Sequence, residues 1–217
     1  MKTFCWKRLL CILTVFVTGS CVQTSVSLDY VPELASIKKG PAIFQSAEFV
    51  DLRQPVPPLV YKPTQRRGGL LGVEWDALAP RFLGTVGADL IDGQTFADHV
   101  FLHESANVIV TRTVAAALSA RGMMASGAPK RFVVGEILEF SVDTVKNPHA
   151  VACLRVTVKD VSGRVLHSKV YTADRQSLDH YPQSGDVVAS LRMLAGHALQ
   201  DAIDAALDDP AMRRAAQ

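Results

Sequence analysis

The chain has 217 residues, 48% of them hydrophobic and 20% charged, and its formal net charge at pH 7 is +2. Three of its 23 basic residues, Lys2, Lys7 and Arg8, lie close to the N-terminus, and without them 20 basic residues face 21 acidic ones, a net charge of −1. This balance excludes the global basicity of a nucleic-acid-binding protein, and the length suits one domain with a substantial core.

The first 21 residues follow the order of a secretory signal. After the basic segment, residues 9–17 form an uncharged and mostly apolar run, and Thr18, Gly19 and Ser20 place short side chains before Cys21. The run is about half of the roughly 20 residues that a membrane-spanning helix needs, whereas it fits the apolar region of a signal peptide. Residues 1–20 are therefore predicted to be a cleaved signal peptide.

The residues before Cys21 resemble the lipobox of bacterial lipoproteins. Gly19, Ser20 and Cys21 match that pattern, and Thr18 stands where leucine is usual. The resemblance implies that Cys21 carries acyl chains such as palmitate, and Val22 after the cysteine implies the outer membrane as the destination. The alternative is an ordinary signal cleaved near Ser20, which leaves Cys21 as an incidental thiol.

Cysteine usage provides no disulfide framework. Cys5 and Cys11 leave with the signal, Cys21 is the predicted lipid site, and Cys153 remains on a strand-like segment. A disulfide needs two thiols, and a single cysteine on a strand is most often a small buried apolar residue.

The mature chain begins with segments that have no helical periodicity. Residues 21–41 are predicted to be the lipidated N-terminus and a flexible tether that holds a folded domain off the membrane. Residues 42–53 are β-like, whereas residues 54–95 are rich in proline and glycine and predict a long excursion from the domain. On general grounds, an excursion of this length is a candidate interaction surface.

The second half of the chain predicts helices and strands more clearly. Ser105 can cap a helix over residues 105–121, and Gly122 supplies its left-handed stop. A strand follows over residues 132–142, and alternating apolar residues predict a hairpin of strands 150–159 and 164–172. With the strand at 42–53 and a last helix, the order is β-α-β-β-β-α. This order predicts an α+β two-layer sandwich, with a mixed four-stranded sheet and two helices packed on one face.

The last helix is predicted over residues 186–207, and Pro210 ends it. Asp208 and Asp209 oppose the negative end of the helix dipole, so fraying is expected there. The single domain is predicted to span residues 42–210, and residues 211–217 are predicted to form a C-terminal tail.

These elements resemble a known group of proteins. The first strand closes in Val50-Asp51-Leu52-Arg53, the first helix ends in Leu118-Ser119-Ala120-Arg121-Gly122-Met123, and a Val/Ile-rich strand, a hairpin and an amphipathic helix follow. In outline, residues 42–207 look like the YajG-like bacterial lipoproteins, and the order of elements is also similar to LptE-type auxiliary lipoproteins. The resemblance implies an envelope lipoprotein without established catalytic residues.

Few residues suggest metal binding or catalysis. His99 and His103 would share one face of a helix, as a zinc site requires, but the sequence has no third ligand nearby and no HExxH pattern. Surface or packed histidines are therefore expected, and no metal or other cofactor is predicted. The GxSxG pattern of many hydrolases is also absent, and the protein is predicted not to be an enzyme.

Two pairs of charged residues are candidate partner-binding sites. Arg66 and Arg67 precede a glycine-rich stretch without the Lys-Ser/Thr of a P-loop, so they predict a flexible basic loop suited to acidic lipid headgroups. Asp51 and Arg53 point the same way in an extended strand. They predict either a salt bridge at the end of the strand or a pair that binds a partner.

Together, these features predict a non-catalytic, lipid-anchored protein of the bacterial outer membrane. Its domain would lie in the periplasm and serve a larger envelope assembly through a protein partner, with no nucleic acid involved. One alternative is a carrier that binds lipid or glycolipid in a pocket between sheet and helices. Another is an envelope hydrolase, which needs a polar cleft with a base beside a nucleophile.

Overall fold

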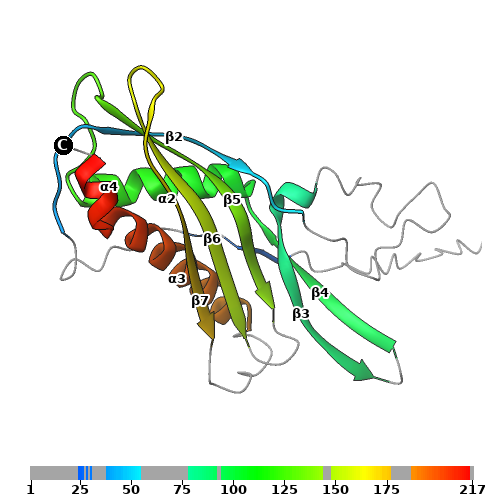
Figure 1. The fold of residues 1–217 in the computed structure, drawn as a ribbon. Coiled ribbons are helices and arrows are strands. Elements are labelled where there is room, and N and C mark those ends of the chain that lie inside the picture. Colours follow the sequence, from blue (N-terminus) through cyan, green and yellow to red (C-terminus); the bar gives the residue numbers. More distant parts are fainter. Residues whose placement is uncertain are drawn as a thin grey trace, which may run out of the picture.

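A computed structural model shows a mixed β-sheet with helices on one face (Figure 1). The structure describes residues 24–26, 28, 30, 38–54, 78–91, 94–143, 148–176 and 187–215, with the backbone alone for residues 24–26, 85–91, 94–99, 187–190 and 192. The elements are β1 (Thr24–Val26), β2 (Phe44–Asp51), the 3₁₀ helix η1 (Ala79–Arg81), β3 (Phe82–Ile91), β4 (Gln94–Leu102), α2 (Ala106–Ala120), β5 (Arg131–Asp143), β6 (His149–Asp160), β7 (Val165–Gln176), α3 (Val187–Asp208) and α4 (Pro210–Ala215).

The strands form one sheet in the order β1-β4-β3-β5-β6-β7, and β2 also pairs with β5. Two strands share one edge of β5, because its first half pairs in parallel with β2 and its end pairs in parallel with β3. The β3–β4 hairpin extends past the end of β5, and β1 adds a short parallel strand beside β4.

The α+β class is confirmed, but the sheet has seven strands among the described residues, whereas four were predicted. Strands β2, β5, β6 and β7 and helices α2 and α3 follow the predicted order, and both helices lie on one face of the sheet (Figure 1). The additional strands are β1, β3 and β4. The sequence conceals them because β1 is short and because glycines interrupt β3, and glycine weakens strand propensity.

One glycine allows β3 to approach β5. A Cβ atom at Gly84 would lie 1.8 Å from the backbone oxygen of Val142, so no larger side chain fits between the two strands. The strand that leaves the proline-rich segment can therefore join the sheet at this position.

Alternation along β6 places its apolar side chains under the helices. Ala152, Leu154, Val156 and Val158 are all buried, as predicted, whereas Arg155 is exposed on the other face. Helix α3 packs on β6 and β7, and α2 packs on β2. The core therefore lies between the sheet and these two helices.

Helix α2 ends as the sequence predicts. Gly122 has φ +64°, its N–H donates to the Ser119 carbonyl at 2.9 Å, and the Met123 N–H donates to the Leu118 carbonyl at 2.8 Å. This pair of hydrogen bonds is a Schellman motif. The Phe44 N–H then donates to the Met123 carbonyl at 3.0 Å, so the stop of α2 is joined to the start of β2.

Residues 210–215 form helix α4, where the prediction placed a tail. Met212 is fully buried, and the Ala211 N–H donates to Oδ1 of Asp209 at 2.7 Å, which caps α4. Asp208 pairs with Arg213 at 2.8 Å. The expected fraying of α3 is not seen, because both carboxylates have partners outside that helix.

Part of the predicted tether is packed on the domain. Beyond the pairing of β1, Leu28 is 3% exposed, and the Tyr30 hydroxyl donates to Asp204 at 3.0 Å. The flexible tether is therefore a wrong prediction for these residues, since a strand and an apolar contact are formed there. Cys21, the predicted signal peptide, Arg66 and Arg67 lie outside the described residues. In the described part of the chain, no helix is long and apolar enough to cross a bilayer.

Candidate functional site

Asp51 and Arg53 form a salt bridge at the end of β2. Nε and Nη2 of Arg53 donate to the two carboxylate oxygens of Asp51 at 2.8 and 2.7 Å. The guanidinium also donates to the carbonyls of Phe82, Phe140 and Pro80, each at 3.0 Å. These bonds tie β2 to β3, β5 and η1, and they leave 5% of the Arg53 side chain exposed. The salt bridge, one of the two interpretations of the sequence, is present. Partner binding by the pair stays a prediction.

His99 and His103 do not lie on one helix face. His99 is in β4, and His103 is exposed in the connection before α2 begins at Ala106. Among the described side chains, no three His, Cys, Asp or Glu residues come together in a group that could hold a metal ion. The helical geometry on which the zinc hypothesis depended is therefore absent at this pair.

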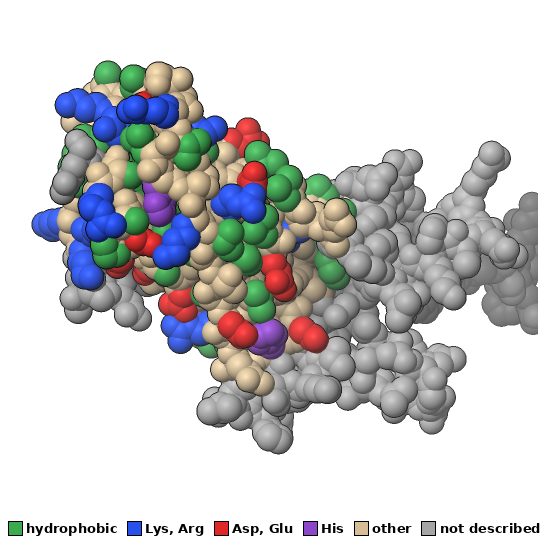
Figure 2. Space-filling model, viewed as in Figure 1, with side chains coloured by type: hydrophobic (Ala, Val, Ile, Leu, Met, Phe, Trp, Pro, Cys, Tyr) green, Lys and Arg blue, Asp and Glu red, His purple; other side chains and the backbone are tan. Residues whose placement is uncertain are grey.

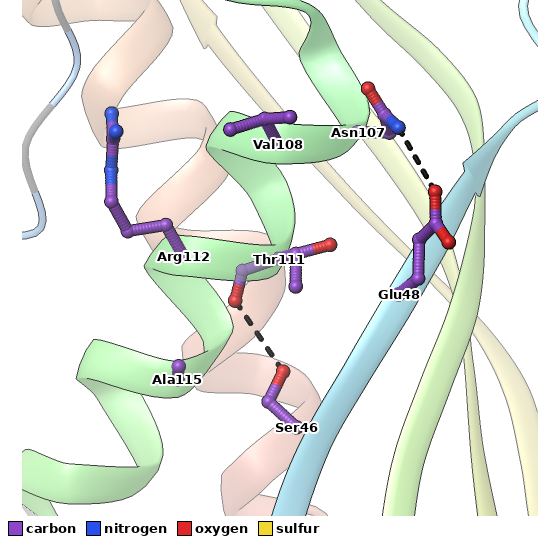
Figure 3. A pocket seen from close by; sticks show the side chains of 7 residues that line it. All are labelled: Ser46, Glu48, Asn107, Val108, Thr111, Arg112 and Ala115. Carbon is purple, nitrogen blue, oxygen red and sulfur yellow. Dashed lines mark hydrogen bonds between the residues drawn. The ribbon is translucent and has the colours of Figure 1, made fainter.

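A shallow depression of about 330 Å³ lies on the surface between β2 and α2 (Figure 3). Its lining consists of small, polar and apolar side chains from these two elements: Ser46, Glu48, Asn107, Val108, Thr111, Arg112 and Ala115.

The polar groups of the depression join β2 to α2. The register of β2 against β5 shifts between Ser46 and Phe49, and the Phe49 N–H donates to Oγ1 of Thr111 at 3.0 Å. Ser46 Oγ donates to the Thr111 carbonyl at 3.4 Å, and Asn107 Nδ2 donates to Glu48 at 3.2 Å (Figure 3). Ser46 has no imidazole beside it among the lining residues, so the depression offers shape and hydrogen bonds but no activated nucleophile.

A buried arginine fastens the N-terminal segment to the two long helices. Arg121 is 1% exposed, and its guanidinium donates to the Tyr30 hydroxyl at 2.9 Å, to Asp204 at 3.0 Å and to Asp208 at 3.5 Å. Burial raises the pKa of the Tyr30 hydroxyl above its ordinary value. The hydrogen bonds of this cluster therefore join residue 30 to the end of α2 and to α3.

A second polar cluster joins β7 to the start of α4. The Tyr171 hydroxyl donates to Asp209 at 3.0 Å, so His167 Nε2, 2.9 Å away, must donate to the same hydroxyl oxygen. Lys169 pairs with Asp209 at 2.8 Å. Burial lowers the pKa of His167 and raises that of Tyr171, while the hydrogen bond from Lys169 lowers the pKa of Asp209. This arrangement favours neutral His167 and ionised Asp209 in the folded state.

Cations gather where α4, the start of β5 and the β6–β7 turn meet, as Figure 2 shows by its blue side chains at the upper left. We call this region the basic end. Its cations come from five separate segments: Lys38, Lys39, Lys130, Arg131, Lys159, Arg164, Arg213 and Arg214.

Hydrogen bonds hold the segments of the basic end together. Arg213 donates to the carbonyls of Lys38 and Lys39 at 2.9 and 3.1 Å, and Arg131 Nε donates to the Ala215 carbonyl at 3.1 Å. Arg131 also lies opposite Asp160 in the pairing of β5 with β6. The sequence does not reveal this surface, because no single stretch of the chain is strongly basic.

Comparison with known proteins gives the fold. No protein-family model matches the chain, and no curated protein matches its sequence. The structure is similar to that of protein XCC0632 from Xanthomonas campestris, of family DUF330, with a TM-score of 0.52 and 14% identity over 83% of this chain and 89% of that one. At this identity, the likeness shows a shared fold alone.

Two other solved structures are less similar. An uncharacterised protein has a TM-score of 0.46 and 12% identity, with coverage of 85% of this chain and 98% of its own. Lipoprotein GNA1162 from Neisseria meningitidis has a TM-score of 0.23 and 10% identity, with coverage of 42% and 69%. These scores are too low to carry an argument about function, and none of the comparisons shows the YajG-like family. The chain is thus an α+β domain of the same fold as the DUF330 protein XCC0632.

Proposed function

We propose that the protein is a lipid-anchored component of the bacterial outer membrane, with acyl chains on Cys21 and its α+β domain in the periplasm. The observation that carries the proposal is the short separation in sequence between the lipobox-like residues and the sheet. Cys21, preceded by Gly19 and Ser20, lies only three residues before Thr24, which pairs with Val100 of β4. Acyl chains on this cysteine would attach a folded domain to the membrane almost directly.

In this proposal, the domain presents a surface to another envelope protein, as a non-catalytic accessory of a larger assembly. The buried apolar side chains of sheet and helices form one continuous cluster, so binding would take place on the outer surface. The resemblance of the sequence to the YajG-like lipoproteins supports the same class of protein.

No observation favours the alternative functions. A carrier for lipid or glycolipid would need a pocket between sheet and helices. Phe49, Ile137 and Leu154, which lie in this layer, are fully buried in the core cluster. A hydrolase would need a base beside a nucleophile, and the depression between β2 and α2 does not supply that pair.

The intact mass of the mature N-terminal peptide tests the anchor. The protein would be made in a Gram-negative host beside a Cys21→Ala control. We expect acyl chains on Cys21, and a membrane-bound fraction that the control loses. An unmodified N-terminus at or near Cys21 would overturn the proposal.

A further inference from the structure

The basic end and the predicted lipid site belong to opposite ends of the sheet. Thr24 pairs with Val100, Val100 pairs with Gly84, and Gly84 pairs with Val142 near the end of β5. Arg131 begins β5 eleven residues before Val142. At about 3.3 Å per residue, the basic end is about 35 Å along the strands from the level of Thr24.

Cys21 cannot reach the basic end, because it lies only three residues before Thr24. An extended chain covers at most about 3.6 Å per residue, so three residues place Cys21 within about 11 Å of Thr24. The β3–β4 hairpin runs from the same level in the direction away from the basic end (Figure 1). Acyl chains on Cys21 would therefore bring the hairpin side of the domain to the bilayer.

The basic end has more positive charge than its own acids neutralise. Arg164 pairs with Asp160, and Arg213 pairs with Asp208. Among the described residues, the other six cations of the basic end have no carboxylate within 4.0 Å. Physiological salt screens charges beyond about 8 Å, so a bilayer held near the level of Thr24, about 35 Å from the basic end along the strands, would not supply the missing counter-charge.

We propose that the basic end is a docking surface for an acidic segment of a partner protein, and that the lipid on Cys21 holds this surface away from the membrane. The inference rests on the proposed function, because the anchor sets the orientation. A surplus of cations at one end of the domain attracts an acidic partner and orients it as it approaches. Anionic headgroups of the bilayer are the competing partner, and the position of Thr24 argues against them.

The test uses the mature acylated protein in phosphatidylcholine vesicles, with dye-labelled decaglutamate as the probe and fluorescence anisotropy as the measurement. One triple variant replaces exposed cations of the basic end with glutamine. A matched triple variant introduces glutamate at exposed sites elsewhere, so that both variants lower the net charge by the same amount. The first is Lys38→Gln with Lys39→Gln and Arg214→Gln, and the second is His103→Glu with Thr172→Glu and Gln176→Glu.

We expect the wild type and the matched variant to bind decaglutamate with similar affinity, which falls with added salt, and the basic-end variant to bind about tenfold more weakly. Equal binding by the two triple variants would overturn the docking surface. Loss of wild-type binding when the vesicles contain phosphatidylglycerol would show that the basic end lies on the membrane, which also overturns it. An unacylated Cys21 would overturn the anchor alone, since the same titration in solution still compares the variants.

Discussion

Leu28→Ala tests whether the N-terminal segment is packed on the domain. Leu28 is 3% exposed and belongs to the core cluster. Leu→Ala changes in cores cost about 2–5 kcal/mol, and the cost is smallest where the surroundings can relax. Because β1 is only three residues long and lies at the edge of the sheet, we expect a loss of about 2–3 kcal/mol in the free energy of unfolding.

Tyr30→Phe tests the same packing through hydrogen bonds. The hydroxyl donates to Asp204 and accepts from Arg121, and the variant loses both bonds. A hydrogen bond contributes about 1 kcal/mol to stability. Arg121 keeps its direct ion pair with Asp204, so we expect a loss of about 1–2 kcal/mol rather than the larger penalty for an unpaired buried charge.

Urea unfolding of the mature chain with Cys21→Ala, followed by circular dichroism, measures both losses. Val161→Ala is the control, since Val161 is 72% exposed and its change should stay within about 0.5 kcal/mol. If Leu28→Ala and Tyr30→Phe also stay within that range, the segment is not packed on the sheet. The short distance between Cys21 and the folded domain, and the orientation inferred from it, would then be refuted.

Three further substitutions test other parts of the structure. Arg53→Ala removes the guanidinium hydrogen bonds to three carbonyls and the ion pair with Asp51, which keeps only the backbone N–H of residue 53 as a donor. It should cost about 2–4 kcal/mol in urea unfolding; a change below about 0.5 kcal/mol would contradict this role. A Cβ atom at Gly135 would lie 2.3 Å from the Arg155 carbonyl oxygen, so Gly135→Val should lower the melting temperature by several degrees, whereas Gly127→Ala, which meets nothing within 4 Å, should not. Burial lowers the pKa of His167, so below about pH 6.5 the unfolded chain binds the proton first and stability falls. His167→Gln should flatten the decline in unfolding free energy between about pH 6.5 and 5, and an unchanged slope would show that another group causes it.

The sequence predicts an element correctly where a local pattern shows which of its residues are buried or where it ends. The β6–β7 hairpin was predictable because its apolar residues alternate, and the end of α2 because Gly122 can adopt a positive φ. Strand β3 follows no such pattern, since its place in the sheet depends on a close approach of Gly84 to Val142 that only the tertiary structure creates. Helix α4 was missed for another reason, because Pro210 predicts the end of α3, whereas a proline can also occupy the first position of a helix, here capped by Asp209.

The Asp51–Arg53 pair and the basic end also differ in how far the local sequence reveals them. The sequence points to Asp51 and Arg53 because they are two residues apart, yet in the structure the Arg53 guanidinium donates to carbonyls of three other segments. At the basic end, the acids nearest in sequence are already engaged: Asp160 by Arg164, and Asp209 by Lys169. A chain whose net charge is close to zero can therefore carry a locally unbalanced surface, because some charges are neutralised in ion pairs and the fold brings the remaining cations together. The whole-chain charge excludes a globally basic protein, but it cannot exclude a docking surface of this kind.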